Sequence, residues 1–75
     1  PFDIVFLDPP YAVAAERVSA LVEGLADSGQ LAPGAVVVYE HAADAAPLDC
    51  GCLEPVRSRT HGITTVDLLV ARTAR

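Results

Sequence analysis

The stretch FDIVFLDPPY, residues 2–11, decides how this 75-residue chain folds. It joins four consecutive apolar residues, IVFL, to a carboxylate, two prolines and an aromatic ring. An uninterrupted apolar run is typical of a parallel strand covered on both faces, so we predict such a strand from Asp3 to Asp8. Proline fixes its own φ and restricts the residue before it, so the strand must end in a stiff, extended loop.

The residues after Tyr11 change from the period of a strand to that of a helix. The apolar side chains at positions 14, 18, 21, 22 and 25 fall on one helical stripe, and Ser28-Gly29 predicts where the helix ends. Pro33-Gly34 predicts a turn, and residues 35–39 predict a second buried strand. Strand, helix and strand over this length form a right-handed βαβ unit.

The remaining residues do not continue this alternation of strand and helix. Residues 41–52 lack periodicity and predict a loop. Arg57 and Arg59 alternate with small polar residues and predict a strand with one polar face, and Pro55 at its start suits the edge of a sheet.

A β-hairpin closes the predicted fold. His61-Gly62 reads as its two-residue turn and residues 63–72 as its second strand. The fold class is therefore α/β, a mixed four-stranded sheet with one crossover helix and a terminal antiparallel hairpin.

The composition points to part of a larger domain. The chain is 52% apolar and contains no methionine, although a domain of this size buries only about 60% of its unfolded surface. We expect residues 1–75 to be a partial domain. A self-contained small module is the alternative.

The charge is unevenly distributed. The net charge of −5 argues against autonomous binding to nucleic acid, because phosphate contacts need lysine or arginine. Residues 1–54 hold nine acidic residues and one arginine, whereas residues 55–75 hold four arginines and one aspartate. Arg57 and Arg59 are therefore candidate RNA contacts, with a solvated edge strand as the alternative.

Cys50 and Cys52 form a C-x-C pair without a second ligand pair at zinc spacing. We predict two free thiols, no metal site and a reducing, cytoplasmic location. An apolar run of about 18 residues is lacking, so the sequence predicts no membrane insertion.

The chemistry of Asp8-Pro9-Pro10-Tyr11 follows from its position at the carboxyl end of a parallel strand, where open α/β sheets bind ligands. The Asp8 carboxylate and the Pro9 carbonyl are two neighbouring acceptors, which match the two N–H donors of an exocyclic –NH₂. A ring beside them can stack on the base that carries the amine. Acceptors off the base plane favour a tetrahedral nitrogen and stabilise the positive charge that develops on transfer.

The same four residues carry a family resemblance. D-P-P-Y after a buried strand resembles motif IV of the S-adenosylmethionine-dependent amino-methyltransferases. FDIVFLDPPY, VVVYEHA and RSRTHGITTVDLLVAR together resemble the C-terminal half of the RsmD-type 16S rRNA guanine-N2 methyltransferases. The resemblance implies the Rossmann-like class I sheet, of which the four strands would be strands 4, 5, 7 and 6 in spatial order.

The resemblance also implies roles. Asp8 and the Pro9 carbonyl would hold the target amine, Pro10 would shape the loop, Tyr11 would stack on the base, and Asp8 would form part of the cofactor site. The cofactor would be S-adenosyl-L-methionine and the partner the rRNA of the 30S subunit. The family's usual Tyr-Gly at the hairpin turn is His61-Gly62 in this chain.

The glycine-rich cofactor loop and the ribose-binding acid of the family are absent from this chain, so we predict that the chain alone is inactive. Three other functions stay open. These are adenine-N6 methylation of DNA or RNA, a non-catalytic α/β partner-binding module, and an unrelated doubly wound domain.

Overall fold

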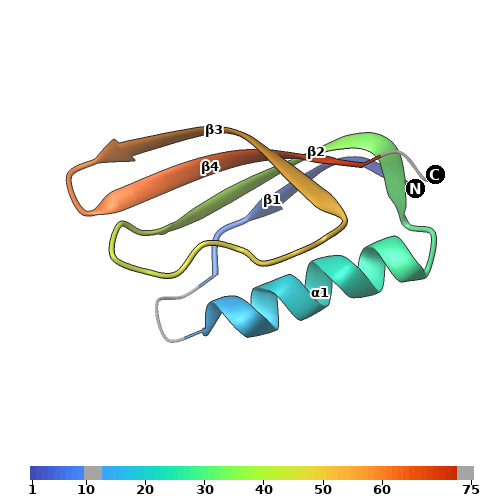
Figure 1. The fold of residues 1–75 in the computed structure, drawn as a ribbon, viewed down its shortest axis with the longest axis horizontal. Coiled ribbons are helices and arrows are strands. Elements are labelled where there is room, and N and C mark those ends of the chain that lie inside the picture. The colour runs from blue at the N-terminus through green and yellow to red at the C-terminus, as the bar shows by residue number, and fades with distance from the viewer. Residues whose placement is uncertain (10–12, 73–75) are drawn as a thin grey trace.

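A computed structural model describes residues 1–9 and 13–72, which form one mixed sheet and one helix (Figure 1). The strand order is β1-β2-β4-β3, with β1 parallel to β2 and both other pairs antiparallel. This is the order predicted from the sequence. The elements in chain order are β1 (Phe2–Leu7), α1 (Ala15–Asp27), β2 (Leu31–Ala42), β3 (Leu53–His61) and β4 (Thr64–Ala71).

Helix α1 covers one face of the sheet, below the strands in Figure 1. It buries Val18 and Val22 against β2. It ends at Asp27 because Gly29 takes a φ of +77°, so that the backbone N–H groups of Gly29 and Gln30 turn back to the carbonyls of the last helical turn. The predicted helix is confirmed to within one residue at its start. The core that it completes consists of Val18, Val22, Leu31, Ala35, Val37, Tyr39, Cys50, Leu53, Leu69 and Ala71.

The opposite face of the sheet stays open. Ile4 and Phe6 are 56% and 75% exposed, whereas Val5 and Leu7 pack against the core. The sequence predicted a strand covered on both faces. Among the described residues β1 is an edge strand covered on one face, and we call the side of the sheet turned away from α1 the open face.

The predicted turn at Pro33-Gly34 lies inside a strand instead. Phe2 pairs with Leu31 and Ile4 pairs with Val36, so two steps along β1 match five along β2. The extra residues form a bulge, in which Gly34 has a φ of +79° that side chains disfavour. The turn prediction was wrong because proline and glycine also mark bulges.

The hairpin turn is displaced by one residue from its predicted position. His61 pairs with Thr64, so the two loop residues are Gly62 and Ile63. Gly62 has a φ of +62°, which suits the first loop position of a type II′ turn. Ile63, predicted in the strand, lies in the turn and is 75% exposed.

The loop predicted over residues 41–52 is confined to 43–52, because His41 and Ala42 belong to β2. It docks on α1 through Ser19. The Asp49 backbone N–H donates to Ser19 Oγ at 3.1 Å, and Cys50 Sγ donates to the Ser19 carbonyl at 3.4 Å. The loop is therefore fixed against the same face of the sheet that α1 covers.

Candidate functional site

Asp8 and Pro9 lie at the carboxyl end of β1, as the sequence predicted. Leu7 pairs with Tyr39 at the last position of the parallel β1–β2 ladder, and Asp8 follows directly. The Asp8 side chain is exposed and Pro9 is half-buried. Pro10 and Tyr11, the other two predicted site residues, lie outside the described residues.

Glu40 follows Tyr39 on β2 just as Asp8 follows Leu7 on β1. Because neighbouring strands are about 4.8 Å apart, Glu40 lies close to the point where β1 ends, although β2 itself continues to Ala42. We call this end of the parallel ladder, with Asp8 and Glu40, the acidic rim. Both are exposed. The carboxyl end of the parallel pair is therefore acidic and open to solvent, which favours ligands with N–H donors or positive charge.

A groove of about 260 Å³ runs from this rim toward α1. Its described lining is apolar except for Asp8 at one end and Arg17 on the helix. The full lining comprises Phe6, Leu7, Asp8, Pro9, Val13, Arg17, Val18 and Leu21. The site thus joins an exposed carboxylate to an apolar wall.

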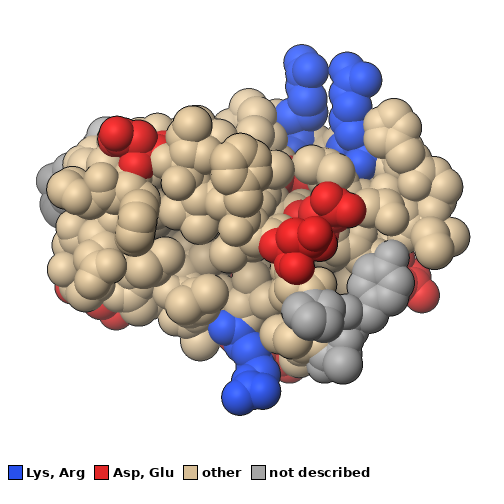
Figure 2. All heavy atoms as spheres, turned by 180° about the vertical axis from the view of Figure 1, so that it is seen from behind, with Lys and Arg blue, Asp and Glu red and all other residues tan. Residues whose placement is uncertain are grey.

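Arg57 and Arg59 share the open face with the acidic rim. Arg59 pairs with Val66, which in turn pairs with Glu40, and paired residues of neighbouring strands project to the same side. Both arginines are exposed. Seen from behind, two basic side chains project together at the upper edge, with an acidic cluster beneath them and a wide area without charge beside it (Figure 2). The predicted alternation along this edge strand is confirmed, because Ser58 and Thr60 bond to residues on the other face.

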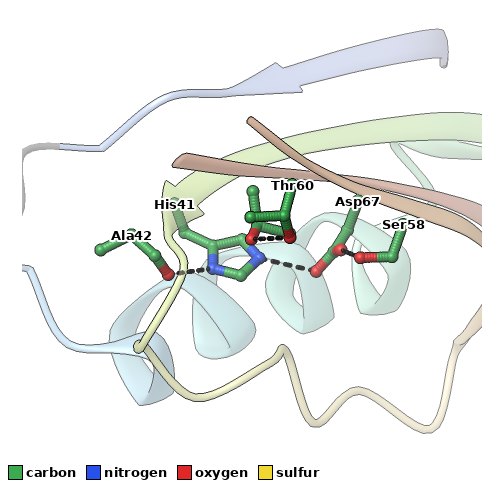
Figure 3. A network of polar contacts seen from close by, with 6 residues as sticks. His41, Ala42, Ser58, Thr60 and Asp67 are labelled. Atoms are coloured by element: carbon green, nitrogen blue, oxygen red, sulfur yellow. Dashed lines mark hydrogen bonds and ion pairs between the residues drawn. The ribbon is translucent and has the colours of Figure 1, made fainter. Parts of the chain in front are cut away.

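A second polar cluster, on the face that α1 covers, links β2 to the hairpin (Figure 3). His41 Nε2 lies 2.7 Å from Asp67 Oδ2, and Ser58 Oγ donates to Asp67 Oδ1 at 2.6 Å. His41 Nδ1 lies 2.9 Å from the Ala42 carbonyl oxygen, and the hydroxyls of Thr60 and Thr65 share a hydrogen bond of 2.8 Å. The cluster borders a cavity of about 700 Å³ between the hairpin and the loop 43–52.

The arrangement of this cluster excludes Ser58 as a nucleophile activated by His41. Asp67 stands between Ser58 and His41, so the imidazole has no direct hydrogen bond to the hydroxyl whose proton a general base must take. The sequence prediction missed the cluster. The signal was Asp67, a lone carboxylate among the apolar residues of β4.

The cysteines are free thiols in the structure. Burial is the main cause that raises the pKa of the Cys50 thiol above its usual 9.0. Within residues 1–9 and 13–72, no three histidine, cysteine or acidic side chains gather in a way that could hold a metal ion.

The family model described as "Conserved hypothetical protein 95" matches residues 1–70. The chain belongs to this family. The resemblance seen in the sequence, to the C-terminal half of the RsmD-type methyltransferases, is confirmed by this match and by the similar structures. None of the curated proteins compared with the chain matches it.

Three solved structures share the fold closely. A provisionally assigned methylase from Haemophilus influenzae is 25% identical, with a TM-score of 0.79, and the match covers 96% of this chain and 44% of that one. A conserved hypothetical protein from Streptococcus pyogenes is 35% identical, with a TM-score of 0.78 and coverage of 95% and 44%. A provisionally assigned methyltransferase from Escherichia coli is 25% identical, with a TM-score of 0.78 and coverage of 96% and 40%.

The chain therefore spans less than half the length of these relatives. The α/β prediction, the C-terminal half of a Rossmann-like methyltransferase sheet, is confirmed. In the described part of the chain, α1 is too short to cross a bilayer.

Proposed function

We propose that this chain is the base-binding half of an S-adenosylmethionine-dependent methyltransferase that acts on an exocyclic amine of a nucleobase. The leading candidate for the amine is N2 of a guanine in the 16S rRNA of the small ribosomal subunit, in the cytoplasm. The observation that carries the proposal is the family match over residues 1–70 together with Asp8-Pro9 at the carboxyl end of β1.

The geometry of the rim supports an amine substrate. Asp8 is exposed at the strand end, beside Glu40, so the rim offers acceptors and negative charge. An amine nitrogen gains positive charge as it attacks a methyl group, and fixed negative groups stabilise that charge most where water is excluded. Asp8 would accept one amine hydrogen and the Pro9 carbonyl the other, while Pro10 and Tyr11 would shape the loop and stack on the base.

The apolar groove beside Asp8 supports a flat substrate. A nucleobase inside a duplex is inaccessible, so the enzyme must extrude it or bind a single-stranded segment. Arg57 and Arg59 on the open face are suited to the phosphates of that RNA, because their side chains are exposed and neighbouring.

The residues present fit the cofactor only in part. Asp8 is a carboxylate suited to the positive charge or hydroxyl donors of S-adenosylmethionine, and the resemblance assigns it part of that site. The cofactor supplies an electrophilic methyl group when bound. The glycine-rich loop and ribose-binding acid that the family uses have no counterpart in this sequence.

The test uses the protein expressed from its complete reading frame. It is incubated with labelled methyl donor and undermethylated 30S subunits, and the modified nucleotide is mapped by mass spectrometry. We expect N2-methylguanine in 16S rRNA. Label on N6 of adenine would shift the assignment to the adenine-N6 enzymes, and absence of label from rRNA and DNA alike would leave a non-catalytic module.

A further inference from the structure

The hydrogen bonds of His41 require more protons than a neutral imidazole carries. Its Nδ1 lies 2.9 Å from the Ala42 carbonyl oxygen, which can only accept, so Nδ1 must donate. Its Nε2 lies 2.7 Å from Asp67 Oδ2, and an ionised carboxylate also only accepts. Both bonds exist together when the ring carries both protons, as an imidazolium paired with the carboxylate.

Charged and aromatic side chains surround the His41 ring. Its partner is the Asp67 carboxylate of β4, and the Tyr39 ring stacks on it with a centroid separation of 4.5 Å, within the range of a cation–π contact. Asp49 of the loop lines the same cavity; Arg57 of β3 also borders it, but its side chain projects to the open face. His41 is only 8% exposed, so water cannot readily replace a lost bond.

The pair ties together three strands of the sheet. His41 lies near the carboxyl end of β2, Asp67 lies on β4, and the second oxygen of Asp67 accepts from Ser58 of β3. We propose that His41 and Asp67 are a proton-dependent clamp that positions the β3–β4 hairpin, with its Arg57 and Arg59, against the acidic rim.

The direction of the dependence follows from the donor count. With both ring protons present, all three bonds of the clamp form. When the ring loses one proton as the pH rises, either the Ala42 bond or the Asp67 bond is lost, and in the second case a nitrogen lone pair faces a carboxylate. The clamp thus stabilises the hairpin at lower pH and is weakened at higher pH.

Asp67→Asn is the variant that separates this clamp from simple packing. An asparagine amide can donate an N–H to Nε2 of a neutral ring, whose Nδ1–H still donates to Ala42, while its carbonyl oxygen accepts from Ser58. All three bonds then form without the extra proton. The substituted clamp should hold the hairpin equally well at all pH values at which the ring is neutral.

The experiment measures amide hydrogen exchange in the whole protein between pH 5.5 and 8.5, corrected for the intrinsic pH dependence of exchange. We expect protection of the hairpin amides of β4 to fall about three- to tenfold in the wild type, the effect of one lost hydrogen bond. In Asp67→Asn it should not fall with rising pH, because all three bonds form there with a neutral ring. His61→Asn, at the exposed histidine of the same hairpin, should behave as the wild type does.

Constant protection in the wild type, or the same fall in Asp67→Asn, would overturn the proposal. A second test of the proposal needs only the wild-type protein. Nitrogen NMR of the His41 ring should show both nitrogens protonated at pH 5.5, and loss of one proton should coincide with the fall in protection. Deprotonation without change in protection would also overturn the clamp. No RNA or methyl donor is needed, so the outcome is independent of the proposed function.

Discussion

The ring of Tyr39 stacks on that of His41, with centroids 4.5 Å apart and planes inclined by 22°. Tyr39 is 2% exposed, and its burial, with the charge of Asp67, raises the pKa of its hydroxyl above the usual 10.0. The hydroxyl is therefore held neutral in the folded protein at pH values where an unfolded chain would ionise it.

This relationship predicts how the protein responds to alkali. A raised folded-state pKa contributes stability that is fully present below pH 10.0, the unfolded value, and is lost as the pH rises through the folded value. The loss is at most about 1.4 kcal/mol per pH unit. In Tyr39→Phe the free energy of unfolding should fall less between pH 9 and 11 than in the wild type, as measured by urea denaturation. Equal falls in both proteins would contradict the argument.

Asp8→Ala should remove methyl transfer and leave binding of the methyl donor largely intact. The carboxylate is proposed to hold the amine and to stabilise its developing charge, and loss of one such group typically lowers kcat by about 10²–10³-fold. Single-turnover transfer to rRNA and calorimetric binding of the methyl donor measure the two effects separately. Asp8→Asn, which keeps an oxygen acceptor but not the charge, should lie between.

Asp3→Ala is the matched control for that experiment. Asp3 is an exposed aspartate on the same strand, at the end remote from the rim. It should retain wild-type transfer. Full activity in Asp8→Ala would remove the role assigned to its carboxylate, and equal losses in both variants would point to a general effect of charge or stability.

Replacing both Arg57 and Arg59 by glutamine should weaken RNA binding without changing its sequence preference. Each side chain that contacts a phosphate releases counterions, so the dependence of log affinity on log salt should become shallower by about one per arginine. The change should appear in titrations of RNA at several salt concentrations, while kcat at saturating RNA stays the same.

Arg72 provides the comparison for the arginine pair. Its side chain is also exposed, but it lies just beyond the end of β4, where it donates to the Gly51 carbonyl and pairs with Glu54 at 3.8 Å. Arg72→Gln should leave the salt dependence unchanged. If Arg72→Gln and the double variant gave the same dependence, Arg57 and Arg59 would be an ordinary solvated edge.

The sequence predicted the elements that depend on local patterns and missed those that depend on register. The helix stripe around Val18 and Val22 follows from a period of 3.6 residues and was located to within one residue. The bulge at Gly34 and the displaced turn at Gly62 could not be predicted, because glycine and proline mark turns and bulges alike. The pairing of His41 with Asp67, 26 residues apart, arises only when β4 is aligned antiparallel to β2.

The same division between local pattern and strand register applies to the candidate site. The position of Asp8 at a strand end follows from the stiff Asp-Pro-Pro sequence, and the structure confirms that position. The neighbouring Glu40 on the rim, and its place on one face with Arg59, depend on strand order and register across β2, β4 and β3. A single sequence contains no direct information on these alignments.

The two cysteines should differ in reactivity although they are two residues apart. Cys50 is buried, its thiol donates to the Ser19 carbonyl, and its raised pKa keeps the reactive thiolate scarce, whereas Cys52 is only partly buried. At pH 8 iodoacetamide should modify Cys52 faster than Cys50, because burial limits access to the Cys50 thiol and its raised pKa limits its thiolate. Peptide mass spectrometry of a labelling time course measures both rates, and in 8 M urea they should converge because burial and the hydrogen bond are lost. Equal rates in the folded protein would mean that the loop carrying Cys50 does not stay docked on α1.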